Sequence, residues 1–438
     1  MLECFAERHQ RLERFLLKRF EDVRESVISD YPLSEAQRLL IGAYFTMEYS
    51  LEAAALFNPS VVPHPDQSDL PPGALRIVLS LRATGEGHLS SIVFRTGTIS
   101  AEGTIEINPP TRFVTVPEVH PNPSYEKRLF MRKLQELGVL SQDAHRLMDL
   151  LGEQFTFAEL TAAAVAHSRE SRLLDSKAGR ASEDVVALAR ANYEICFDPE
   201  GRLSERVIFP QAPTEARGIE DARFVRFCDD DGCATYYATY TAFDGAVTLP
   251  QLLQSQDFIS FKISTLNGPA VQNKGMALFP RKIGGLYAIL SRQDGENVYL
   301  MYSEQLHFWH EKRLLLRPTY PWEFVQLGNC GSPIETEAGW LVLTHGVGAM
   351  RRYAIGAVLL DLDDPSRVIG RLTEPLLEPT PEEREGYVPN VVYTCGGLVH
   401  NGQLILPYAA SDQFTGFATV PVNELIEALL SHPPGRPK

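Results

Sequence analysis

The segment Gly218-Ile219-Glu220-Asp221-Ala222-Arg223-Phe224 carries the clearest chemical signal in the chain. Two adjacent carboxylates, followed two residues later by an arginine, suit a site in which a guanidinium holds and tunes a neighbouring acid. An acidic turn closed by a salt bridge is the simpler interpretation, and composition alone favours it. The segment is therefore a candidate for acid–base chemistry, and its assignment depends on which other residues converge on it.

A strand pattern elsewhere in the chain indicates how such residues would be positioned. Short apolar or aromatic segments that end in polar or charged residues occur at 76–82, 235–241, 285–292, 339–345 and 402–408. The last four are separated by roughly 50 to 65 residues, near the upper end of propeller repeats. We predict a mainly β chain that forms a five-bladed β-propeller with these segments as its innermost strands. A two-sheet sandwich is the alternative.

The polar ends of these five segments would meet around one central channel. Several of them carry a positive charge or can donate hydrogen bonds, which favours an anionic or highly hydroxylated ligand. Any one of them, taken alone, is explained equally well by a strand end that meets solvent. The residues at these ends are Arg82, Thr241, Arg292, His345 and Tyr408.

Helical patterns flank and interrupt the β-rich part. Residues 1–55 form a predicted N-terminal helical extension, with one helix over Glu3–Ser29 and a second that follows a capping box at Ser34 and runs through Leu51. A helical insertion is predicted at about 125–192, between the first two blades, and a C-terminal helix at about 422–430. The catalytic propeller domain would then span 56–438.

Composition excludes several classes of function. Lysine plus arginine number 41 and aspartate plus glutamate 56, so the net charge is 41 − 56 = −15. Such an acidic chain would repel nucleic acid. The apolar runs are too short for a membrane span of ~20 residues, and no signal peptide is visible. Six cysteines without metal-ligand spacing favour reduced thiols in the cytoplasm and no metal site.

Two motifs resemble a known family. The segment Gly218–Phe224 and the following Tyr236–Ala242 are similar to the Glu-Asp-Pro-Arg and Tyr-Thr-Ala motifs of glycoside hydrolase family 130, which comprises mannoside phosphorylases and β-mannosidases on a five-bladed propeller. The resemblance covers roughly 56–105 and 190–425, in the same order. Ala222 replaces the usual proline, and the helical additions mark a divergent subgroup. Further similar segments are 57–60, 273–280, 328–333, 339–347, 353–365, 386–393 and 408–412.

The resemblance implies roles for individual residues. Asp221 matches the family's general acid, and Lys274, Arg292 and His345 match positions that bind phosphate in the phosphorylases. The expected activity is inverting phosphorolysis of β-linked mannosides, with β-1,2 linkages favoured, to give α-mannose 1-phosphate. Inorganic phosphate would be a co-substrate, and no other cofactor is expected. Residues expected to contact the substrate are Asn58, Arg82, Glu220, Arg223, Tyr408 and Asp412.

Two other functions stay open at this point. An inverting β-mannosidase would use water, and Glu194, Glu220 or Glu385 could serve as its base. A non-catalytic mannoside-binding protein could retain the same fold. The expected partners are a small oligosaccharide and phosphate, and the apolar stripe of the N-terminal helices predicts contacts in a homo-oligomer.

Overall fold

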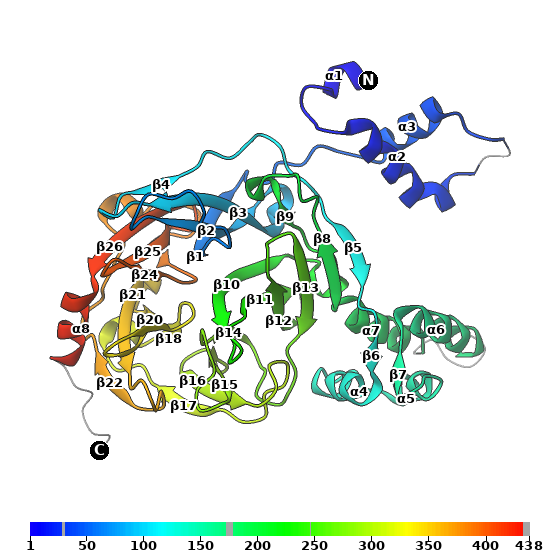
Figure 1. Ribbon diagram of the computed structural model, residues 1–438. Helices are drawn as coiled ribbons and strands as arrows, with labels where there is room; N and C mark the ends of the chain where they lie inside the picture. The colour runs from blue at the N-terminus through cyan, green and yellow to red at the C-terminus, as the bar shows by residue number, and fades with distance from the viewer. Residues whose placement is uncertain (29–30, 172–177, 246, 432–438) are drawn as a thin grey trace.

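Antiparallel sheets dominate the computed structural model, which describes residues 1–28, 31–171, 178–245 and 247–431. Within these residues, five sheets of four or more strands follow one another along the chain and surround a common centre, as Figure 1 shows. A sixth, two-stranded sheet joins β6 (Tyr125–Glu126) to β7 (Gln154–Phe155). The chain is therefore mainly β, as its sequence predicts.

The first two sheets contain the longest strands. In the first sheet, the order is β1 (Ala55–Pro63), β2 (Leu75–Thr84), β3 (Ser90–Ile99) and β4 (Ile105–Ile107), with β9 (Val207–Ile208) also on β3. In the second sheet, the order is β10 (Ile219–Cys228), β11 (Ala234–Phe243), β12 (Thr248–Ser255), β13 (Ser260–Thr265), β8 (Tyr193–Cys196) and β5 (Glu118–Pro121).

The other three sheets follow the same up-and-down pattern. The third contains β14 (Lys274–Leu278), β15 (Tyr287–Arg292), β16 (Val298–Ser303) and β17 (Arg313–Leu316). In the fourth, β18 (Gln326–Asn329) and β19 (Ile334–Thr336) both pair with β20 (Gly339–Val347), which continues to β21 (Tyr353–Leu360) and β22 (Val368–Arg371). In the fifth, β23 (Val392–Tyr393) and β24 (Leu398–His400) pair with β25 (Gln403–Ala410), next to β26 (Phe414–Pro421).

The five recurring segments are the second strand of each sheet, not the innermost as expected. The first strands lie at the inner edges, and β10 contacts both β1 and β14 across the sheet boundaries (Figure 1). A second strand has partners on both sides and sheets on both faces, so its sequence is a nearly continuous apolar run. All nine residues of β20 are buried, for example. First strands lack this signature because they carry the polar side chains described below.

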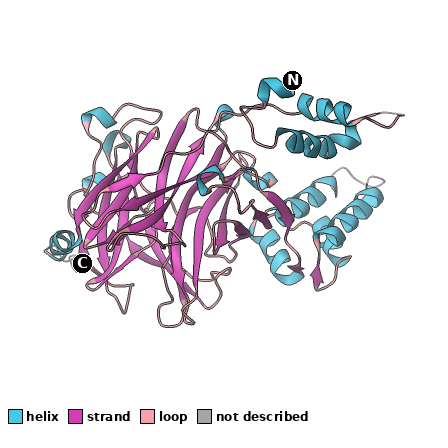
Figure 2. Ribbon diagram, turned by 45° about the horizontal axis from the view of Figure 1, so that its top comes forward, coloured by secondary structure: helices cyan, strands magenta, loops and turns pink. Residues whose placement is uncertain are grey.

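The N-terminal helices form a small unit that projects from one side of the molecule (Figures 1 and 2). They are α1 (Leu2–Phe5), α2 (Leu12–Val23) and α3 (Glu35–Tyr44), so the single helix expected over Glu3–Ser29 is interrupted, and its end at Ser29 lies outside the described residues. The break precedes α2, where Arg11 has a left-handed φ of 52°. The capping box at Ser34 is present, but α3 ends at Tyr44 rather than near Leu51. Arg19 donates to the carbonyl of Phe45 and satisfies one of the exposed carbonyls at this helix end.

Four further helices lie between the first and second sheets in sequence and beside the outer strands β5 and β8 in space (Figure 1). Their apolar faces form a core of their own, which includes Phe130, Leu147 and Leu160. Buried Lys133 donates to the Leu266 carbonyl at 2.7 Å and thereby joins this unit to the second sheet. The helices are α4 (Lys127–Glu136), α5 (Gln142–Asp149), α6 (Phe157–Ser171) and α7 (Ala178–Arg190). The C-terminal helix α8 (Val422–Leu430) packs on β21 and β22.

A short Pro-x-Glu turn precedes the first strand of three sheets, at 213–215, 321–323 and 381–383. In the first of these turns the carboxylate of Glu215 is fully buried. It accepts hydrogen bonds from the backbone N–H groups of Gln211 and Ala212 and from the hydroxyls of Tyr193 and Tyr240. Four donors from three segments thus share one carboxylate, which holds the chain as it enters β10.

Glu215→Ala should lower the free energy of unfolding by about 2–4 kcal/mol, because it leaves buried donors without an acceptor. Urea unfolding followed by circular dichroism measures the change. Glu200→Ala is the matched control, since the Glu200 side chain is 84% exposed and should change stability little. An equal effect of both substitutions would contradict the role assigned to Glu215.

Candidate active site

Three first strands carry a β-bulge at the same end of their sheets. The register shifts between Phe57 and Ser60 in β1, between Glu220 and Arg223 in β10, and between Lys274 and Ala277 in β14. At or beside each bulge stands a residue with left-handed φ, a conformation that Asn and Asp tolerate better than other side chains. These residues are Asn58 (φ 50°), Asp221 (φ 55°) and Asn273 (φ 59°). The bulges turn side chains of three sheets out of the regular alternation and toward one centre.

The carboxylate of Asp221 is the centre of the resulting cluster and is buried. The amide nitrogen Nδ2 of Asn58, from the first sheet, donates to Asp221 Oδ1 at 2.7 Å. The Nη1 atom of Arg82 on β2 lies 3.7 Å from the same oxygen. The two sheets thus meet through one carboxylate oxygen.

Glu220 lies between two cations beside Asp221. Arg82 Nη2 donates to Glu220 Oε1 at 2.9 Å, and Lys274 Nζ lies 3.7 Å from Glu220 Oε2. The side chains of Arg82 and Glu220 are each 21% exposed, whereas that of Lys274 is 37% exposed. The end of Lys274 therefore remains accessible to a ligand.

Arg292 and His345 form a second group of side chains beside this cluster. The strand register places Arg292 opposite Lys274 and His345 opposite Gly328, and Arg292 Nη1 lies 3.1 Å from His345 Nε2. Burial, and then the charges of Arg292, Arg223 and Lys274, hold the pKa of His345 well below its usual value. The ring is therefore neutral at physiological pH and can accept a hydrogen bond from the guanidinium. Among the described residues, Arg292 has no carboxylate within ion-pair distance, and its strand partner Lys274 is one of the cations beside Glu220.

Arg223 has a different environment, although the sequence grouped it with the substrate contacts. It is 3% exposed, and its guanidinium donates to the carbonyls of Cys330 and Asp221 and to the hydroxyl of Tyr393. Its hydrogen bonds are therefore made within the protein. The arginine stabilises the bulge that carries Asp221, and its positive charge lowers the pKa of that carboxyl.

The fifth sheet brings Tyr408 and Asp412 to the same end. Tyr408 Oη donates to Glu383 Oε1 at 2.7 Å, and Asp412 (φ 50°) lies in the hairpin between β25 and β26. Glu383 was missed in the sequence, although its Pro-x-Glu turn repeats those of Glu215 and Glu323. Burial, followed by the negative charge of Asp221, raises the pKa of Asp412 to about 6.

The pKa of Asp221 is shifted in the opposite direction. Burial opposes ionisation of Asp221, but the charges of Arg82, Arg223 and Lys274 outweigh it and hold the pKa of this carboxyl below its usual value. Without a ligand, Asp221 is ionised at neutral pH. The expected general acid consequently needs a further negative charge nearby before it can carry a proton.

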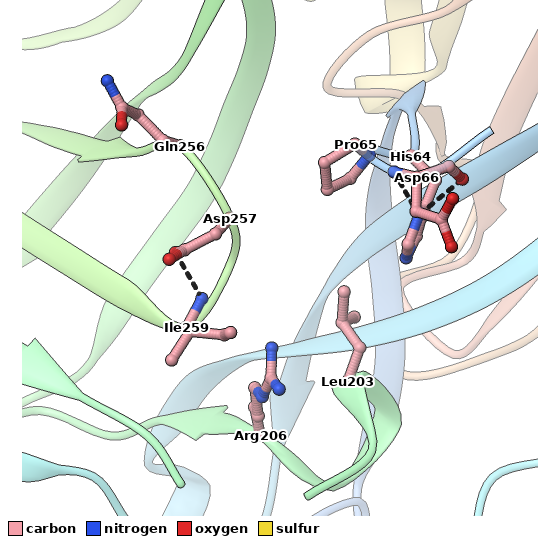
Figure 3. A pocket seen from close by; sticks show the side chains of 8 residues that line it. All are labelled: His64, Pro65, Asp66, Leu203, Arg206, Gln256, Asp257 and Ile259. Atoms are coloured by element: carbon pink, nitrogen blue, oxygen red, sulfur yellow. Dashed lines mark hydrogen bonds between the residues drawn. The ribbon is translucent and has the colours of Figure 1, made fainter. Parts of the chain in front are cut away.

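The remaining candidates lie elsewhere. Glu194 is on β8, four strands away from β10 in the order of the second sheet, and Glu385 is in an exposed loop. A hollow of about 430 Å³ lies beyond the opposite end of β1 from Asn58 and contains none of the expected site residues (Figure 3). Its walls include His64, Asp66, Leu203, Arg206 and Asp257. Within the described residues, no three His, Cys, Asp or Glu side chains are grouped to hold a metal, and no helix is long and apolar enough to cross a membrane.

Comparison with known proteins agrees with the motifs on β10 and β11. Residues 180–430 match the sequence model of glycoside hydrolase family 130, described as beta-1,4-mannooligosaccharide phosphorylase. The chain belongs to this family. The predicted family resemblance is thereby confirmed, and the chain is a member of a carbohydrate-active enzyme family. The match includes Asp221, Lys274, Arg292 and His345, whereas Asn58 and Arg82 precede it.

Individual relatives cover about half of the chain. It is 36% identical to a 1,2-beta-oligomannan phosphorylase of Thermoanaerobacter sp. (strain X514) over 54% of its own length and 80% of the relative. It is 31% identical to a beta-1,2-mannobiose phosphorylase of Listeria innocua over 51% of its length and 63% of the relative. The solved structure of a Listeria innocua β-1,2-mannobiose phosphorylase superposes with a TM-score of 0.54 at 22% identity, covering 88% of this chain and 95% of that one, which shows a shared fold.

Asp412→Asn should stabilise the protein increasingly as pH rises. The pKa of Asp412 when folded is about 6, above the ordinary value of 3.8, so its contribution to stability is full below about pH 4 and is lost as pH rises through 6. Asparagine removes this titration. Relative to the parent, the variant should gain about 1–2 kcal/mol between pH 4 and pH 8. Thermal unfolding across that pH range measures it, and a difference independent of pH would contradict the assignment.

Proposed function

We propose that the protein cleaves β-linked mannosides by phosphorolysis, with inversion, to give α-mannose 1-phosphate. The observation that carries this proposal is that two cations, Lys274 and Arg292, pair in register near a buried carboxylate, and that Arg292 has no carboxylate partner among the described residues. The relatives named above are phosphorylases of β-1,2-linked mannosides, which favours the β-1,2 linkage. In this proposal the five sheets are the blades of a propeller spanning 56–438, with residues 1–55 as an extension and about 125–192 as an insertion.

The two halves of the reaction use different parts of the site. An oxocarbenium-like transition state needs a proton on the leaving oxygen and a nucleophile on the opposite face of the sugar. Asp221 supplies the proton. Phosphate is itself the nucleophile, so it needs positioning rather than a general base: Arg292 can bind it bidentately, Lys274 contributes a point charge, and His345 orients the guanidinium of Arg292. Asn58, Arg82, Glu220, Tyr408 and Asp412 contact the hydroxyls of the sugar.

Bound phosphate also favours the protonated form of Asp221, which the general acid requires. Lys274 is one of the cations that lower the pKa of Asp221, and it also borders the proposed phosphate site. A dianion there offsets its charge and that of neighbouring arginines, so the pKa of Asp221 rises. Proton uptake by the acid and phosphate binding are then thermodynamically linked, and each favours the other.

Sulfate tests this linkage, because it is a dianion that does not titrate near neutral pH. Saturating sulfate should raise the pKa of Asp221, followed by the carboxyl signals of ¹³C-labelled aspartate in nuclear magnetic resonance titrations. Asp221→Asn identifies the signal by its loss. The signal of Asp66, which lies near the hollow at the other end of β1, serves as an internal control and should not shift. An unchanged pKa of Asp221 with sulfate bound would refute the linkage.

Hydrolysis by water is the second candidate activity. It requires a carboxylate base, and Glu220 is the one candidate of the three that lies within the cluster. However, Glu220 is engaged by both Arg82 and Lys274, and the proposed phosphate site has no role in hydrolysis. Phosphorolysis therefore accounts for more of the observed contacts.

Incubation with β-1,2- and β-1,4-linked mannosides, with and without phosphate, distinguishes the candidates. A phosphorylase should form mannose 1-phosphate only when phosphate is present, whereas free mannose independent of phosphate would indicate the hydrolase. Asp221→Asn should lower turnover by orders of magnitude and leave binding in place, because it removes the transferable proton and little volume. Arg292→Ala should raise the KM for phosphate at least about tenfold through loss of a charge-assisted pair. Retained turnover in Asp221→Asn would refute the acid assignment.

We also propose a location and a mode of assembly. All six cysteines are free, which fits the reducing cytoplasm. The N-terminal helices and the segment after them expose apolar side chains, including Tyr44 at 81% and Met47 at 79%, and we propose that they contact a second copy of the chain.

A further inference from the structure

Two aromatic rings from distant parts of the sequence, in loops attached to the first and fifth sheets, stack on each other. His88 lies in the hairpin between β2 and β3, and Tyr387 lies in the loop that precedes β23. Their ring centroids are 5.7 Å apart at an interplanar angle of 22°, and Tyr387 Oη lies 3.4 Å from His88 Nδ1. The pair connects the first and fifth sheets.

The strand register places this pair beside the candidate active site. His88 lies in the turn that follows Arg82 on β2, at the bulged end of the first sheet. The N–H of Val388, next to Tyr387, donates to the carbonyl of Ser411 at 3.0 Å, and Ser411 adjoins Asp412. The two rings therefore lie at the ends of the first and fifth sheets that also carry Arg82 and Asp412, two expected sugar contacts.

Tight packing of the backbone positions the rings. A Cβ added to Gly386 would meet the Ser411 side chain at 2.5 Å, so the loop runs directly against the β25–β26 hairpin. His88 itself has a left-handed φ of 58°. Tyr387 nevertheless remains 56% exposed, so burial of its ring does not explain the stack. A stacked partner limits the motion of the tyrosine and reduces the entropy that a ligand must remove on binding.

We propose that the His88–Tyr387 pair is a stacking platform for the outer sugar units of a bound oligosaccharide. Pyranose rings present apolar C–H faces that pack against aromatic rings, while their hydroxyls remain hydrated. An exposed, pre-ordered aromatic face beside sugar-binding polar groups is suited to such a ligand. The ligand class, β-linked mannooligosaccharide, rests on the proposed function, whereas the platform itself rests on the contacts above.

Calorimetric binding of β-1,2-linked mannobiose, mannotriose and mannotetraose without phosphate tests the platform, since a phosphorylase cannot turn over without phosphate. In the parent protein, affinity should rise with chain length as more sugar reaches the two rings. Tyr387→Ala should weaken binding of the longer sugars about tenfold and that of mannobiose less. Tyr387→Phe should bind like the parent, because it keeps the ring, and His88→Ala should show an intermediate loss.

Leu150→Ala is the control, because Leu150 is 60% exposed at the end of α5, in the helical unit between β5 and β8 and outside the proposed contact between copies. It should leave the dependence on chain length unchanged. The proposal is overturned if Tyr387→Ala keeps that dependence and only lowers thermal stability, as a purely structural contact between sheets would. It is also overturned if the parent shows no gain with chain length. If the parent protein forms no mannose 1-phosphate but its affinity still rises with the length of the sugar, the proposed function is wrong and the platform is not contradicted.

Discussion

The arrangement of the site depends on one buried charge. Asp221 is placed at the junction of three sheets, where burial alone would neutralise it, and cations from neighbouring strands keep it ionised. Arg82, Arg223 and Lys274 must therefore all remain close to it. The β-bulges at the same end of the first three sheets bring these residues together. A carboxylate without these partners would carry the full cost of its burial.

The cations around this charge serve different purposes. The hydrogen bonds of Arg223 are made inside the protein, so it acts as a support for β10. Lys274 and Arg292 face each other across β14 and β15 and keep capacity for an incoming anion. The same positive field therefore stabilises the unliganded site and attracts the proposed phosphate. Binding of that phosphate redistributes the field and favours a protonated Asp221.

The second strand of each sheet is easier to recognise in the sequence than the first strand. Second strands such as β20 are buried on both faces and read as plain apolar runs, which is why five of them could be predicted. First strands are short, bulged or broken, as β18 and β19 show. Their polar residues obscure the alternation of apolar and polar side chains that marks a strand in a sequence. The recurring strands were therefore found, but their position in the sheets was wrong. Glu383 was missed because its turn has no obvious chemistry until Tyr408 is placed beside it.

The mainly β class, the family, and the set of acidic and basic residues available to the site could all be predicted from the sequence, because they follow from residue type and local spacing. Which of these residues meet depends on the folded arrangement of the sheets. Asn58 and Asp221 are separated by 163 positions yet share a hydrogen bond, and His88 and Tyr387 are separated by 299. Protonation also belongs to the folded state, because the burial and the neighbouring charges that set the pKa values of Asp221 and Asp412 exist only once the sheets have closed around them.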